Sequence, residues 1–173
     1  MSAIENWIGI SGSWRKINSE IEQSVRKTVR DTIDAGGGIV TGGALNVDYF
    51  ATDEALHKDP KAEHVRVFLP TTLDTYAAHY RKRAIEGVIT SSQAEDLIEQ
   101  LNRLKKANPN ALVEEPKNSV VDQTTYYERN MRVIESSDAL VIFQVNDSPG
   151  TQDAIDKAKQ KGIPITVNSY IID

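Results

Sequence analysis

The chain has 173 residues, of which 39% are hydrophobic, so it is long enough for a buried core and matches the size of one domain, residues 1–173. It contains no cysteine, which excludes disulfides, thiolate metal sites and cysteine nucleophiles. The formal net charge of −5 argues against a nucleic-acid partner, because such a field repels a polyanion. The sequence shows no signal peptide and no apolar run long enough to span a membrane, so we expect a cytoplasmic protein.

The first predicted unit consists of a strand, a turn of small residues and a helix. Residues 7–10 form a short apolar strand, and residues 11–15 interrupt it. The following segment carries apolar residues at every fourth position, as on a helix that lies on a sheet: Ile21, Val25, Val29 and Ile33. We expect the N–H groups of Ser11, Gly12 and Ser13 to hold a phosphate that Arg15 neutralises. A surface arginine beside a tight turn is the alternative.

The second unit, residues 36–56, contains the most distinctive turn. Ile39 and Val40 form a short strand, and the turn Thr41-Gly42-Gly43-Ala44 precedes a helix that opens near Val47. Glycines before a helix start suit a phosphate, because backbone N–H groups and the helix dipole both favour an anion. The turn could also serve packing alone. Asp48 could cap the helix, or accept a hydrogen bond from a ribose hydroxyl or a base N–H.

A third strand over residues 64–70 is followed by a predicted helical insertion over residues 71–116. A capping box from Ser92 to Glu95 is expected to open its second helix. The insertion carries dense cations with acids between them, which favours a solvated surface over a nucleic-acid or ligand contact. Its leucines could form a contact between copies of the chain or belong to the core.

The last unit begins with a helix that starts at Asp122 or Thr124 and includes Arg129 and Asn130. An apolar strand over residues 138–143 follows, then a third turn containing Ser148, Gly150 and Thr151, a helix, and a final strand over residues 163–167. Alternating strands and helices predict an α/β fold, a doubly wound parallel sheet of about five strands with helices on both faces. Right-handed crossovers would bring the three turns to one edge of this sheet.

The order of these parts resembles the SLOG superfamily of Rossmann-like proteins. The residues that carry the resemblance are Ser11-Gly12-Ser13, the segment Gly37 to Asp48, Arg129 to Met131, and Ser148-Pro149-Gly150-Thr151. The resemblance implies a nucleotide or a phosphorylated nucleoside derivative as ligand. We therefore predict a binding site, without a metal ion, made of Ser11, Gly12, Ser13, Arg15, Gly42, Gly43, Ala44, Asp48, Arg129, Asn130, Ser148, Gly150 and Thr151.

The superfamily also implies two alternatives. The first is an enzyme that cleaves or transfers an N-glycosidic bond, like its phosphoribohydrolases, or like the deoxyribosyltransferases with their related sheet. This chain has Ala154 where the phosphoribohydrolases carry a glutamate. For the deoxyribosyltransferase reading, which uses a carboxylate nucleophile, the candidates are Asp48, Asp147, Asp153 and Glu128. The second is a single-stranded DNA-binding module like the DNA-processing protein DprA, using the basic helices of the insertion. Dimerisation is common for such sheets, so the sequence is compatible with a homodimer or a higher homo-oligomer.

Overall fold

A parallel sheet forms the centre of the computed structural model, which describes residues 3–173. Its strands are β1 (Trp7–Gly12), β2 (Gly38–Thr41), β3 (Val65–Phe68), β4 (Leu112–Val113), β5 (Ala139–Val145) and β6 (Ile165–Tyr170). They lie in the order β4-β3-β2-β1-β5-β6. The strand order therefore reverses at β1, where β2 lies on one side and β5 on the other. Sheets of this kind bind ligands beside such a switch point, at the carboxyl ends of the strands.

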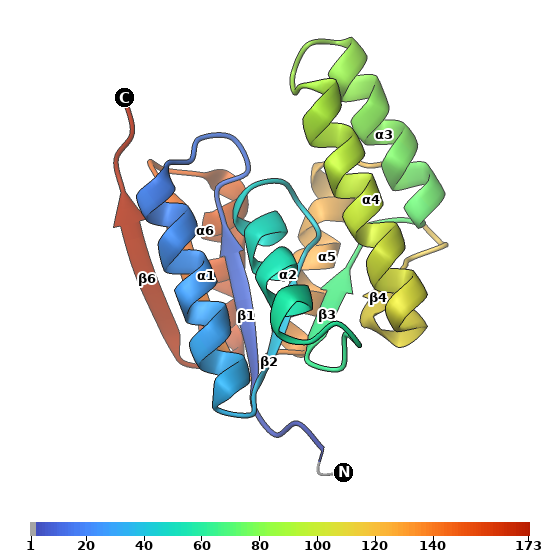
Figure 1. Ribbon diagram of the computed structural model, residues 1–173. Coiled ribbons are helices and arrows are strands. Elements are labelled where there is room, and N and C mark those ends of the chain that lie inside the picture. Colours follow the sequence, from blue (N-terminus) through green and yellow to red (C-terminus); the bar gives the residue numbers. More distant parts are fainter. Residues whose placement is uncertain (1–2) are drawn as a thin grey trace.

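Helices cover both faces of the sheet (Figure 1), which confirms the predicted Rossmann-like α/β fold. The helices are α1 (Ser19–Asp34), α2 (Val47–Lys58), α3 (Leu73–Ile85), α4 (Ser91–Ala107), the 3-10 helix η1 (Pro109–Ala111), α5 (Gln123–Glu135) and α6 (Pro149–Lys161). Helices α1 and α2 pack together on one face, and α5 and α6 pack together on the other. Helices α3 and α4 form a hairpin beside the β4 end of the sheet.

The sheet has six strands where the sequence predicted about five. The additional strand, β4, lies inside the predicted insertion and pairs with β3 through Leu112 and Val113. Two residues are too few to show the alternation from which strands are recognised. The insertion also belongs to the core, because Leu97, Leu101 and Leu104 of α4 are fully buried in the main hydrophobic cluster. These leucines are core residues, which decides between the two readings of the sequence.

The second helix of the insertion begins two residues earlier than predicted. Its capping box joins Thr90 and Gln93, not Ser92 and Glu95. Glu95 instead accepts hydrogen bonds from Arg81 of α3. The start of α5 agrees with the sequence, since Asp122 caps it and bonds to the N–H of Thr125.

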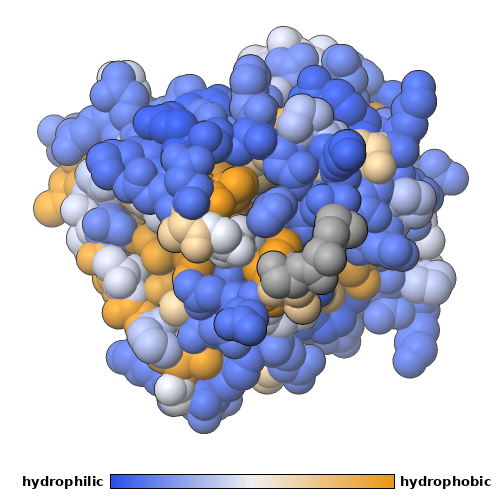
Figure 2. All heavy atoms as spheres, turned by 60° about the horizontal axis from the view of Figure 1, so that its bottom comes forward, coloured by the Kyte–Doolittle hydropathy of each residue, from blue (hydrophilic) through white to orange (hydrophobic). Residues whose placement is uncertain are grey.

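The carboxyl and amino edges of the sheet face opposite sides of the molecule. All strands point toward the upper side in Figure 1, where the loops after β1 and β2 lie. Figure 2 brings the lower side forward; hydrophilic residues cover most of it, and hydrophobic residues gather mainly on one flank. Among residues 3–173, no helix is long and apolar enough to cross a membrane.

Gly12 allows the first loop to leave β1 between two neighbouring elements. A Cβ atom here would lie 2.5 Å from the carbonyl oxygen of Phe143 and 2.8 Å from the side chain of Val47. Backbone contacts of this kind cannot be relieved by rotating a side chain. The glycine is therefore required by the packing of β1 against β5 and α2.

We predict that Gly12→Ala lowers the free energy of unfolding by about 1–3 kcal/mol, because the new methyl group overpacks this junction. Gly150→Ala is the matched control, since a Cβ at Gly150 meets no atom within 4 Å. The control should change stability by roughly 0.5 kcal/mol or less. Urea denaturation of the three proteins measures both effects. Equal stability of the Gly12 and Gly150 variants would contradict the packing argument.

Candidate functional site

A cleft with a volume of about 810 Å³ opens at the carboxyl ends of β1 and β5. The loops after β1, β2 and β5 contribute to its lining, together with the start of α5 and residues of α3. Each predicted site residue except Gly43 lines it: Ser11, Gly12, Ser13, Arg15, Gly42, Ala44, Asp48, Arg129, Asn130, Ser148, Gly150 and Thr151. The three turns therefore meet at one edge. That these residues bind a ligand stays a prediction.

Gly43 faces the core and not the cleft. A Cβ atom at this position would lie 2.7 Å from Leu69, and the φ of +69° is one that L side chains rarely adopt. Its carbonyl oxygen accepts a hydrogen bond of 2.9 Å from the hydroxyl of Tyr76. Burial raises the pKa of Tyr76, so this hydroxyl keeps its proton and remains a donor. Gly43 is thus a folding residue of the loop.

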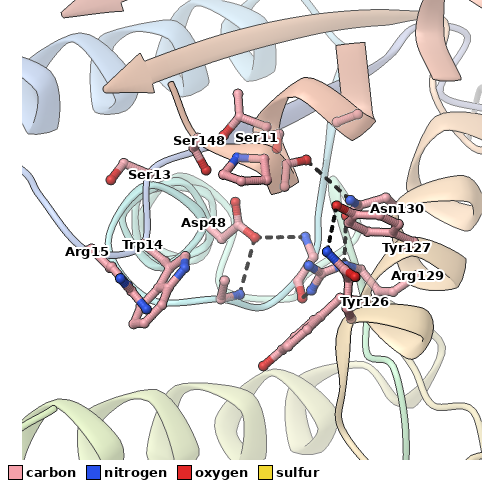
Figure 3. Close-up of a pocket in the computed structure, with 18 of the residues that line it drawn as sticks. Ser11, Ser13, Trp14, Arg15, Asp48, Tyr126, Tyr127, Arg129, Asn130 and Ser148 are labelled. Atoms are coloured by element: carbon pink, nitrogen blue, oxygen red, sulfur yellow. Dashed lines mark hydrogen bonds between the residues drawn. The ribbon is translucent and has the colours of Figure 1, made fainter. Parts of the chain in front are cut away.

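The carboxylate of Asp48 accepts hydrogen bonds from backbone N–H groups of the loop after β2. Oδ2 of Asp48 accepts hydrogen bonds of 3.2 Å from the N–H groups of both Gly42 and Ala44 (Figure 3). These are the donors that the sequence assigned to a phosphate. Because the carboxylate of Asp48 already accepts from them, these two N–H groups are occupied within the chain, and phosphate binding at this loop stays a prediction.

Arg129 holds the same loop from the opposite side. Its Nη1 donates to the carbonyl oxygen of Gly42, and its Nε donates to Oδ1 of Asn130. Burial raises the pKa of Asp48, while the positive charge of Arg129 acts in the other direction. Arg129 therefore holds Gly42 in place, a role that the sequence did not predict, and its predicted contact with a ligand stays a prediction.

In the loop after β1, the N–H group of the central residue, Ser13, is also hydrogen-bonded within the chain. The N–H of Ser13 donates to the carbonyl of Phe143 at 3.2 Å, and the hydroxyl of Ser13 accepts from the N–H of Lys16 at 3.2 Å. The amide of Asn46 donates to the carbonyl of Trp14, which ties this loop to the start of α2. Arg15 remains exposed, with its guanidinium 4.5 Å above the ring of Trp14.

The third turn, between β5 and α6, differs from the other two because N–H groups at the start of α6 are not hydrogen-bonded within the described chain. Ser148, the residue that precedes α6, makes no capping hydrogen bond with its side chain. In the described chain, the N–H groups of Gly150 and Thr151 have no hydrogen-bond partner. Helix α5 contacts the first turns of α6, because Nδ2 of Asn130 donates to Oδ2 of Asp153 at 3.0 Å. Of the three turns, this one matches the predicted phosphate site best.

The sequence missed several side chains of the cleft. Four of these side chains lie close in the sequence to a predicted site residue: Trp14 and Lys16 flank Arg15, and Tyr126 and Tyr127 precede Arg129 by one helical turn or less. Two further side chains, His79 and Arg83, come from α3. Burial and the charge of Arg83 lower the pKa of His79. No sequence signal marks the α3 residues, because their place depends on how the hairpin packs.

The carboxylates suggested for glycosidic chemistry are distributed unevenly. Asp48 and Asp147 line the cleft, whereas Asp153 and Glu128 do not. Asp153 instead forms an ion pair with Lys157 on the next turn of α6. Among residues 3–173, no group of three or more histidine, aspartate or glutamate side chains could hold a metal ion.

Residues 2–171 match the model of the family described as DNA recombination-mediator protein A. The chain belongs to this family. Comparison with curated protein sequences gives no match. The membership also fits the resemblance to the SLOG superfamily, which includes DprA.

Solved structures with a similar fold include two DprA proteins. DNA processing protein A from Helicobacter pylori, described with a single-stranded DNA binding mode, has a TM-score of 0.69 and 22% identity, over 95% of this chain and 65% of that one. DprA from Streptococcus pneumoniae has a TM-score of 0.51 and 14% identity, over 93% of this chain and 58% of that one. The chain thus spans about three fifths of these DprA proteins.

A third similar structure is the molybdenum cofactor binding protein from Rippkaea orientalis, with a TM-score of 0.59 and 14% identity, over 97% of this chain and 78% of that one. At these identities the structural likeness shows the shared fold.

The expectation that nucleic acid is not a partner is wrong. It rested on the net charge of −5, and membership in a DNA recombination-mediator family, with a DNA-binding DprA among the similar structures, overturns it. Net charge describes the whole molecule, whereas the cleft is lined by the exposed cations Arg15, Lys16 and Arg83 together with the exposed acids Asp122 and Asp147. Local potential and total charge can therefore differ in sign.

The buried carboxylate of Asp48 leads to a prediction of how the stability of the chain depends on pH. Because burial raises the pKa of Asp48 above 3.8, the folded chain binds the proton of Asp48 more tightly than the unfolded chain does. Asp48 thus lowers stability progressively as the pH rises from 3.8 through its raised pKa. Asp48→Asn keeps an oxygen for the two loop N–H groups and removes this titration.

We therefore expect the difference in the free energy of unfolding between Asp48→Asn and the unchanged chain to shift in favour of the variant as the pH rises from 3.8 through the raised pKa. The shift is about 1.4 kcal/mol for each unit by which the pKa is raised. Urea denaturation of both proteins between about pH 4 and about pH 7 measures the difference. A difference that stays constant with pH would contradict a raised pKa.

Proposed function

We propose that this chain binds single-stranded DNA in the cleft at the carboxyl edge of the sheet. Membership in the DNA recombination-mediator family supports this, as does the fold shared with the H. pylori protein that is described as binding single-stranded DNA. The observation that carries the proposal is that exposed cations, aromatic rings and open helix donors line the same cleft. Proteins that bind single strands combine these features.

The cations of the cleft are better suited to phosphates than those of the predicted insertion. Arg15 has no ion pair in the described chain and lies at the surface. The basic residues on α3 and α4 are largely neutralised by acids: Arg81 by Glu95, Arg83 by Glu86, Arg103 by Asp53 and Lys105 by Glu114. Of these, Arg83 alone lines the cleft. We therefore place the phosphates at Arg15, Lys16 and the start of α6.

The aromatic residues favour a single strand over a duplex. Trp14, Tyr126 and Tyr127 are half-buried and line the cleft. Stacking of a base on an aromatic side chain is worth about 1–3 kcal/mol, and it requires a base whose faces are free. In a duplex both faces of each base are already covered by its neighbours.

A second candidate is a free nucleotide or phosphorylated nucleoside as ligand. The cleft volume of about 810 Å³ lies within the range of roughly 300–1,000 Å³ that is typical of small-molecule sites. The shared fold with a protein that is described as binding a molybdenum cofactor is compatible with such a ligand. Formation of a homo-oligomer stays a prediction.

Binding of a fluorescent oligo(dT) at several salt concentrations tests the proposal. We expect Arg15→Ala to weaken binding and to reduce the slope of log K against log salt by about 0.7, which corresponds to the loss of one phosphate contact. Arg81→Ala is the matched control, because Arg81 is exposed, is paired with Glu95 and does not line the cleft.

Equal effects of the two variants would contradict DNA binding in the cleft. Competition by a mononucleotide distinguishes the second candidate. If micromolar mononucleotide displaces the oligonucleotide completely, a free nucleotide is the preferred ligand.

A further inference from the structure

The floor of the cleft contains a carboxylate that is only half engaged. Asp48 is 6% exposed, and its Oδ2 holds the two loop N–H groups. Its second oxygen, Oδ1, has no hydrogen-bond partner among residues 3–173, and it points away from the loop (Figure 3). Oδ1 is not among the buried polar atoms that lack a partner, so it is accessible from the cleft, and a ligand in the cleft can donate a hydrogen bond to it.

A donor lies beside this acceptor. Arg129 is 8% exposed and uses its Nε and Nη1 for Asn130 and Gly42. In the described chain its Nη2 has no partner, and the side chain lines the cleft. Arg129 and Asp48 both contact Gly42 and both line the cleft, and the charge of Arg129 acts on Asp48, so the two side chains are near each other on the floor.

A phosphate does not fit this area, because it can only accept hydrogen bonds and the charge of Asp48 repels it. The edge of a nucleobase does fit, since each base presents an N–H next to a carbonyl oxygen or a ring nitrogen. Aromatic side chains flank the floor, with Trp14 on one side and Tyr126 and Tyr127 on the other (Figure 3). They offer flat surfaces to an inserted ring.

We propose that Asp48 and Arg129 read the hydrogen-bonding edge of a nucleobase, with Oδ1 of Asp48 accepting a base N–H and Nη2 of Arg129 donating to the adjacent acceptor. The inference rests on the proposed binding of single-stranded DNA and adds the orientation of the strand. The base enters the cleft, and the phosphates remain at Arg15 and the start of α6. Asp48 is then a specificity-determining residue of the site.

Oligo(dT) and an oligonucleotide of N3-methylthymidine of equal length test this orientation. The methyl group removes the base N–H and leaves the phosphates unchanged. We expect the unchanged chain to bind oligo(dT) roughly ten- to hundredfold more tightly, which corresponds to one hydrogen bond to a charged group.

Asp48→Asn tests the residue itself. Its amide oxygen can still accept from the loop, while its NH₂ replaces the free oxygen, so the ratio between the two oligonucleotides should fall to about one. Asp156→Asn makes the same chemical change on the exposed side of α6, outside the cleft lining, and should keep the full ratio. Thermal unfolding of both variants confirms that they are folded.

Three results would overturn the inference. Equal binding of both oligonucleotides by the unchanged chain rejects base reading and leaves DNA binding in the cleft intact. Retention of the ratio in Asp48→Asn rejects Asp48 as the acceptor. Absence of any binding to oligo(dT) rejects the proposed function together with this inference.

Discussion

Two buried groups of opposite charge hold Gly42 from both sides, and the geometry of the cleft depends on this clamp. Asp48 binds the N–H of Gly42, and Arg129 binds its carbonyl oxygen. The clamp connects the loop after β2 to α5, although the two residues Gly42 and Arg129 are 87 positions apart in the chain. Each group holds a different atom of Gly42, and the positive charge of Arg129 partly offsets the effect of burial on the pKa of Asp48. The loop is therefore fixed before any ligand arrives.

Much of the fold follows from local patterns. Apolar runs mark β1 and β5, and the stripe over α1 has the period of a helix on a sheet. The handedness of parallel crossovers then brings the turns to one edge, which is why their convergence could be predicted. Strand β4 could not, because its two residues form a strand only through pairing with β3.

The roles of the turns were less predictable than their places. Small residues at a turn indicate that N–H groups are accessible, but not whether another part of the chain occupies them. Asp48 occupies those of Gly42 and Ala44, and Phe143 occupies that of Ser13. Such contacts depend on tertiary packing. Net charge misled for a similar reason, since −5 is a sum over the chain and does not give the potential of one cleft.

The central claim is that DNA binds in the cleft, and a residue-resolved binding map tests it most directly. NMR spectra of the ¹⁵N-labelled chain, recorded during titration with oligo(dT), report which backbone amides change. The account predicts the largest shifts at Arg15, at Gly150 and Thr151, and at Tyr126. Shifts confined to the outer surface of α4, around Arg103 and Lys105, with the cleft amides unchanged, would contradict it.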